Sequence, residues 1–213
     1  MSTWFHPRRL GVAAVAVVFL AGCSPSKTAV PASEQPTQAT TPTAAPQIVT
    51  AKTAFWPMYT AAHNWASDVE VLRITSKEVA GFKNEKGKAA MWEAAFASPS
   101  QHTYRVYTYS IVDVPPDLYK GVTAGMDRPW GGDTRNAMPI DLSTFNVDSD
   151  AAYTTAAGDA GVWLKKNPGK DFSAMEVADT SKFPDPMWYV MWGTPKDGFA
   201  AWVDANTGAL TKK

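Results

Sequence analysis

Two similar stretches constrain the fold more than any other feature of this sequence. MWEAAFASP at 91–99 and MWYVMWGTP at 187–195 carry Met, Trp and Pro at matching places, with a constant offset of 96 residues, so Trp92 corresponds to Trp188. A pattern that occurs twice in one chain indicates either a duplicated structural unit or a ligand surface used twice. The segments around the two stretches decide between these interpretations.

The segment before the first stretch has the pattern of an amphipathic helix. Its apolar residues recur three and four positions apart, at Phe55, Met58, Tyr59, Ala62, Trp65 and Ala66. Pro57 is compatible only with the first turn of such a helix, and Asp68 follows its end. The segments VEVLRI, MWEAAFA and YRVYTYSIV are typical of strands. Residues 53–124 are therefore expected to form a helix followed by an antiparallel meander.

The second stretch stands in the same order of segments. Asp148, Ser149 and Asp150 are cap-forming residues that precede AAYTTAAGDAGVWLKKNPG, which has apolar helical spacing and lysines at its carboxyl end. Strand-like segments follow at 173–177, 187–192 and 198–204. DANTG at 204–208 predicts a tight turn into a short last strand at 209–210. Residues 148–213 are expected to form a second helix and meander.

These patterns predict an α+β fold of two related halves, each a helix packed on an antiparallel meander, joined by residues 125–147. A single helix on a single sheet needs large inward aromatic side chains, so Trp92 and Trp188 are interpreted as core residues in preference to ligand contacts. The apolar run WYVMW lacks strict alternation. One of its faces is therefore expected to be covered by the other half or by loops.

The second half resembles the PepSY domain family, small α+β modules of bacterial envelope proteins and of some peptidase propeptides. The resemblance rests on the Ala-rich helix opening at Ser149-Asp150, on PMWYV at 186–190, and on 199–208 with its Val-Asp-Ala-x-Thr-Gly ending. It implies a binding or inhibitory module without catalytic residues. The first half departs from the pattern, because DVPPDLYKGV replaces the Asp-x-x-Thr-Gly turn.

The amino terminus has the pattern of an export signal: Arg8 and Arg9 precede LGVAAVAVVFLAG, an apolar run too short to span a bilayer. The run ends in LAGC at 20–23, which resembles the lipobox of bacterial lipoproteins. The resemblance implies removal of residues 1–22 and lipidation of Cys23, which would anchor the protein to the membrane through its acyl chains. The alternative is an ordinary secretory signal with an unrelated cysteine. Ser24 in place of Asp implies the periplasmic face of the outer membrane, in an organism that has one.

Residues 23–52 are expected to form a lipidated cysteine and a disordered linker, because Ser, Thr, Ala, Pro and Gln dominate them. A flexible chain of this length has a mean reach of roughly 30 Å. Cys23 is the only cysteine, so neither an internal disulfide nor a thiolate metal site can form. Basic and acidic side chains number 20 each, and loss of Arg8 and Arg9 would leave a net charge of about −2. This balance disfavours nucleic acid as a partner.

No pattern of catalytic or metal-binding residues occurs in the sequence. HExxH, GxSxG and GxGxxG are absent, and His63 and His102 each have an ordinary structural interpretation. Helix capping explains the aspartates at 148 and 150 better than calcium binding does. Glu93 and Asp113 could form a glycosidase pair only if folding brought them together. We therefore expect no catalytic residues, no metal and no cofactor.

The connecting segment 125–147 contains the candidate ligand contacts. Trp130 stands beside two glycines and is the tryptophan expected to be accessible, with charged residues near it at Asp127, Arg128, Asp133 and Arg135. The alternative is that Trp130 covers a sheet edge between the halves.

Three hypotheses for function follow. The first is a lipid-anchored, non-enzymatic envelope protein that binds or inhibits a peptide, an envelope protein or a peptidase, for example by strand addition at a sheet edge. The second is an enzyme or binding protein of the cell wall or of carbohydrate that uses the Trp130 loop. The third is a spacer or assembly subunit without a ligand of its own.

Overall fold

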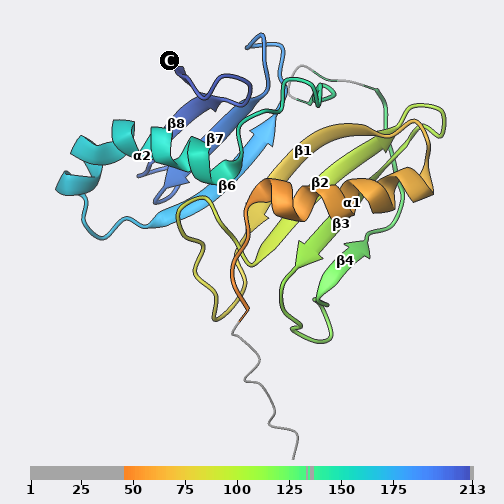
Figure 1. Ribbon diagram of the computed structural model, residues 1–213, viewed down its shortest axis with the longest axis horizontal. Coiled ribbons are helices and arrows are strands. Elements are labelled where there is room, and N and C mark those ends of the chain that lie inside the picture. Colours follow the sequence, from red (N-terminus) through yellow and green to blue (C-terminus); the bar gives the residue numbers. More distant parts are fainter. Residues whose placement is uncertain (1–45, 133, 135–136, 212–213) are drawn as a thin grey trace, which may run out of the picture. The chain divides into compact units, whose positions relative to one another are not determined.

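The predicted strands of both halves join into a single antiparallel sheet in the computed structural model, which describes residues 46–132, 134 and 137–211 (Figure 1). The helices are α1 (Ala51–Trp65) and α2 (Ser149–Lys166). The strands are β1 (Glu70–Lys77), β2 (Met91–Ser98), β3 (Thr103–Ser110), β4 (Gly121–Ala124), β5 (Arg128–Pro129), β6 (Phe172–Ala178), β7 (Met187–Trp192), β8 (Phe199–Asp204) and β9 (Leu210–Thr211). The predicted α+β class with antiparallel strands is confirmed.

The strand order is β4-β3-β2-β1-β6-β7-β8-β9, with β5 paired to β3. The first strands after the two helices, β1 and β6, pair with each other at the centre, where Thr75 lies opposite Glu176 and Ile74 opposite Val177. Each meander runs outward from this central pair. The sheet is therefore continuous across both halves.

Both helices lie on the same face of the sheet (Figure 1), where one large apolar core joins them to the strands. Trp92 and Trp188 are fully buried in this core, which confirms their interpretation as core residues. The indole Nε1 of Trp92 donates to the carbonyl of Val49 at 3.0 Å, and that of Trp188 donates to the carbonyl of Val147 at the same distance. Each bond satisfies the one polar group of a buried indole.

The amino ends of the two helices meet and share one capping carboxylate. Oδ1 of Asp148 accepts from the backbone N–H of Ser149 in its own helix at 2.7 Å and from that of Lys52 in α1 at 3.0 Å. The hydroxyl of Ser149 accepts from the N–H of Ala51 at 2.8 Å. Asp148 thus places a negative charge at the positive ends of two helix dipoles.

Residues before position 52, the expected end of the linker, already make contacts of the fold. Val49 pairs with Ala89 and accepts the bond from the Trp92 indole, Thr50 caps α1, and Ala51 is fully buried. The expected linker is wrong for residues 49–52, because these contacts offset the entropy cost of ordering the segment. The earlier start also places Pro57 beyond the first turn of α1, contrary to expectation.

The connecting segment 125–147 is less irregular than expected. β5 lies within it and pairs with the start of β3, with Arg128 opposite Tyr104. Farther along, Met138 bridges to Asp179, and the N–H of Ile140 donates to the carbonyl of Val71 at 2.7 Å. Ile140 is buried in the helix-side core. The segment therefore passes from the opposite face of the sheet to the helix side before α2 begins.

Candidate binding groove on the helix-free face

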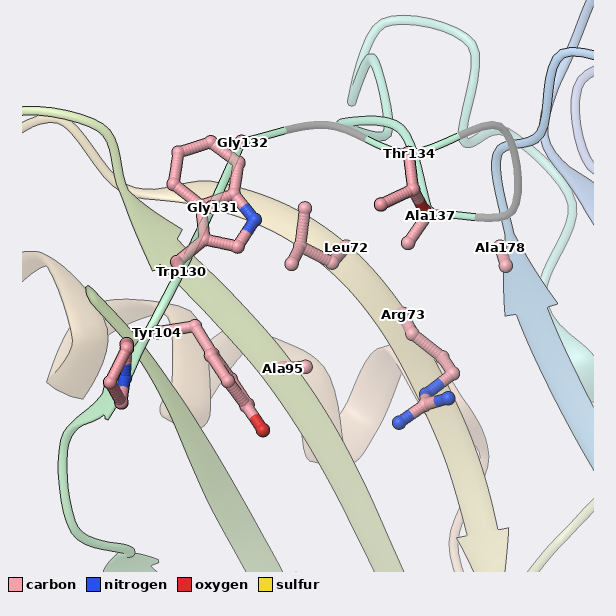
Figure 2. Close-up of a pocket in the computed structure, with 11 residues that line it drawn as sticks. Leu72, Arg73, Ala95, Tyr104, Trp130, Gly131, Gly132, Thr134, Ala137 and Ala178 are labelled. Atoms are coloured by element: carbon pink, nitrogen blue, oxygen red, sulfur yellow. The ribbon is translucent and has the colours of Figure 1, made fainter. Parts of the chain in front are cut away.

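The face of the sheet opposite the helices is the part of the structure that offers a binding site. In Figure 2 the helical ribbon lies behind the strands, while Trp130, Leu72, Tyr104 and Arg73 stand in front of them. We call this surface the helix-free face. A small apolar cluster of Leu72, Ala95 and Ala97 covers part of it.

A pocket of about 350 Å³ lies on this face. Ala95 and Ala178 form its floor with Leu72, while Tyr104 and Trp130 stand beside it and Arg73 adds a guanidinium group (Figure 2). The surface is hollowed here because Ala95 and Ala178 have short side chains, whereas Arg73, opposite both of them, has a long one. We call this the Trp130 pocket.

Trp130 reaches the pocket because its backbone continues the pairing of β5. Its N–H donates to the carbonyl of His102 at 2.9 Å, and its ring packs against the cluster that contains Leu72 and Ala95. The ring is half-buried and also lines the pocket. It therefore covers the face of the first half's strands, while part of the ring remains accessible to a ligand.

The other predicted contacts either do not line the pocket or lie outside the described residues. Asp127 accepts from Nε of Arg105 at 2.7 Å, and this guanidinium lies 4.7 Å from the ring centroid of Trp65 in α1. The Asp127 hydrogen bond raises the pKa of Arg105. Arg128 is exposed and does not line the pocket. Asp133 and Arg135 lie outside the described residues.

Arg73 and Glu176 are the groups that sequence reasoning missed. Nε of Arg73 lies 3.7 Å from Oε2 of Glu176, and this oxygen also accepts from the hydroxyl of Thr75 at 2.9 Å. The pairing register of β1 is irregular between Val71 and Arg73, which brings Leu72 and Arg73 to the same pocket. Local alternation would have placed these two successive residues on opposite faces.

A second pocket of about 320 Å³ adjoins the first, since Ala178 lines both. Tyr189 and Trp202 form one wall with ring centroids 5.1 Å apart. Nζ of Lys182 lies 4.9 Å from the ring centroid of Phe183 and 5.8 Å from that of Trp202. Burial raises the pKa of Tyr189, and the charge of nearby Glu176 adds to this effect. The two pockets together form a groove across the strands of both halves.

Three charged residues line the groove among the described residues: Arg73 in the Trp130 pocket, and Glu176 and Lys182 in the second pocket. Arg73 is the one charged residue among the described residues that line the Trp130 pocket. Glu93 pairs with Lys77 at 2.9 Å and Asp113 accepts from the N–H of Lys120, and neither lines this pocket or its neighbour. Across the described chain, no three His, Cys, Asp or Glu side chains gather closely enough to hold a metal ion. Neither described helix has the length and hydrophobicity to cross a bilayer.

Comparison with known proteins adds little to this description. No protein-family profile matches the sequence, and no curated protein matches it significantly. A crystal structure of a protein from Clostridium difficile 630, provisionally named a lipoprotein, is similar with a TM-score of 0.45 and 9% sequence identity. The similarity covers 73% of this chain and 88% of that chain. Similarity at this level does not transfer a function.

Proposed function

We propose that this chain is a lipid-anchored protein of the bacterial cell envelope that acts as a non-enzymatic binding module. The anchor is supported by the LAGC motif at 20–23 after an apolar run, and by the Pro- and Thr-rich segment that separates it from the folded part. Ser24 favours the periplasmic face of the outer membrane in an organism with two membranes. Residues 1–45 lie outside the described structure, so this part of the proposal rests on sequence.

We further infer that the two halves are copies of one PepSY-like unit. Each half has a helix followed by an outward-running meander, and in each a buried tryptophan bonds to the valine two positions before its helix. If a two-fold axis related the meanders, equivalent residues would lie opposite each other at the centre of the sheet. Thr75 and Glu176 hold equivalent positions in the two halves, and they do lie opposite each other. In the first half, residues 111–120 form a longer connection than the tight turn of the second.

The groove on the helix-free face is the observation that carries the binding role. The groove combines partly accessible aromatic side chains and a floor of alanines with three charged groups among its described residues, Arg73, Glu176 and Lys182. This combination is typical of surfaces that bind peptides or proteins. The described sheet edges are poorer candidates for strand addition, since β4 has four residues and β9 has two. A peptide, an envelope protein or a peptidase bound across the groove fits the geometry best.

Photo-crosslinking in living cells tests this role. Arg128 is exposed and lies opposite Tyr104, which lines the Trp130 pocket. Replacing it with p-benzoylphenylalanine should give a discrete covalent adduct on irradiation. The matched control places the same residue at Val162, which is 69% exposed on α2. An adduct from Val162 alone, or from neither position, would contradict a partner on the helix-free face.

A carbohydrate-binding role is the second candidate, favoured by the partly accessible ring of Trp130 beside Tyr104. The enzymatic version lacks support, because the described residues of that pocket carry no carboxylate and Asp127 is paired with Arg105. Calorimetric titration with soluble peptidoglycan fragments tests the binding version. Heat that disappears in Trp130→Ala but persists in Trp56→Ala would favour it over a peptide.

A further inference from the structure

We propose that the Trp130 pocket binds the carboxyl terminus of an extended peptide, with an apolar last side chain against Trp130 and Leu72 and the terminal carboxylate on the guanidinium of Arg73. The inference rests on the proposed binding role of the helix-free face and specifies its ligand class.

The positive charge of Arg73 favours the carboxyl end of the peptide. Arg73 is the one charged group among the described lining residues of the pocket, and its side chain is 55% exposed. The contact with Glu176 at 3.7 Å involves Nε, while the guanidinium also carries two terminal amino groups. These amino groups have the planar geometry that holds a carboxylate through two hydrogen bonds. Glu176, itself bonded to Thr75, orients Arg73 from the side.

The apolar part of the pocket selects the side chain. Figure 2 shows Leu72 and Ala95 between the ring of Trp130 and the guanidinium of Arg73, all on one face of the sheet. A carboxylate on Arg73 would therefore leave its neighbouring side chain over Leu72 and against the indole. A volume of about 350 Å³ accommodates one large side chain together with a terminal carboxylate.

The openness of the site to solvent favours a peptide over a fatty acid. Pro129 and Gly131 are exposed at its rim, and the pocket continues through Ala178 into the one lined by Tyr189 and Trp202. Preceding peptide residues can lie along this continuation. A long acyl chain requires an enclosed apolar cavity to bury its surface, which this groove does not provide.

Fluorescence polarisation with defined peptides tests the proposal. The full-length protein in detergent is titrated into labelled Gly-Gly-Gly-Phe as the free acid, into its carboxyl-terminal amide, and into Gly-Gly-Gly-Gly as the free acid. The free acid ending in Phe should bind best. Amidation should weaken binding about tenfold or more, because it removes a charge-assisted pair of hydrogen bonds.

Two substitutions in β1 separate the specific effect of Arg73 from the general effect of positive charge. Arg73→Met should weaken the free acid as much as amidation does and should leave the amide unchanged. Lys77→Met, which removes one positive charge from the same strand outside the pocket, should stay within about twofold of the native protein. Circular dichroism checks that both variants fold.

Three results would overturn the proposal: equal binding of acid and amide, binding unaffected by Arg73→Met, or binding of decanoate without any of the peptides. An adduct from position 128 in cells would still support the helix-free face as a binding surface in each of these cases. The two proposals can therefore fail separately.

Discussion

At the scale of single residues, the structure depends on polar side chains that accept hydrogen bonds from the backbone of more than one element. Asp148 is the clearest case, because one carboxylate oxygen accepts from the first turns of both helices. The sequence predicts a cap at this position for α2. It contains no local sign that the same group also serves α1, almost 100 residues away.

Asp148→Ala should lower the free energy of unfolding by about 1 to 2 kcal/mol, because capping is lost at two helices at once. Urea denaturation followed by circular dichroism measures the change. Asp159→Ala removes an exposed carboxylate from the middle of α2 and should change stability by less than about 0.5 kcal/mol. Equal effects of the two substitutions would show that Asp148 has no special role as a cap.

Asp68 gives a second prediction at this scale. The N–H of Ser100 and the hydroxyl of Ser98 donate to its carboxylate, and these bonds lower its pKa from 3.8 to about 2. A carboxyl whose pKa is depressed by folding stabilises the protein above its unfolded pKa and loses that contribution as the pH falls through the folded value. The stabilisation should therefore disappear between about pH 4 and pH 2.

The stability difference between native protein and Asp68→Asn, measured in urea at pH 6 and at pH 2, should shrink toward zero at the lower pH. An NMR titration of the Asp68 side chain should give a midpoint near 2. A midpoint near 3.8 would mean that the bonds to Ser98 and Ser100 do not form in solution.

At the scale of elements, local sequence patterns predicted both helices and most of the strands. Period-3.6 spacing located both helices, and aromatic or β-branched runs located β1, β2, β3, β6, β7 and β8 within a few residues. The predicted turn is present, with Gly208 at a φ of 75°. β4 and β5 were not predicted; both are short strands that pair with β3, and β5 has only two residues.

The site was less predictable than the elements, for a physical reason. Trp130 could be selected because an aromatic ring beside two glycines is visible in the sequence. Arg73 and Ala178 lie far apart in the sequence and meet only because β1 pairs with β6, a long-range contact that no local pattern encodes. The register shift near Arg73 further reverses the face that alternation would assign.

A substitution at Gly87 tests whether the loop between β1 and β2 packs against the start of α2. A β-carbon at this position would lie 2.3 Å from the carbonyl oxygen of Ser149, and its φ of 75° is unfavourable for other residues. Gly81 in the same loop has a φ of 83° but nothing within 4 Å, so it isolates the backbone strain.

Gly81→Ala should cost about 1 kcal/mol from strain alone, and Gly87→Ala should cost at least about 2 kcal/mol more because the loop or α2 must move. Thermal unfolding of both variants provides the comparison. Similar losses in the two would mean that the loop does not pack against the start of α2 as described.

At the scale of the whole molecule, the lipid anchor is the first property to test. Cys23→Ser removes the thiol that would carry the lipid, so the variant should incorporate no radiolabelled fatty acid and should keep its signal or leave the membrane fraction. Membrane fractionation and labelling of native and variant cells measure this. Full labelling of the variant in the membrane would contradict the anchor.

The division of the sheet into a covered face and a free face is the central structural claim about function. The helices bury one side of both meanders, and the groove between Trp130 and Trp202 occupies the other. The tryptophans report on both sides, because Trp56 is 51% exposed on α1 while Trp130 lies on the helix-free face.

Indole ¹⁵N–¹H NMR of the full-length protein during addition of a pool of random heptapeptides with free carboxyl ends tests this claim most directly. Substitution of each tryptophan by Phe assigns its signal. The account predicts that the Trp130 signal shifts while those of Trp56 and the buried Trp92 stay in place. A shift of Trp56 without Trp130, or no shift at all, would contradict binding on the helix-free face.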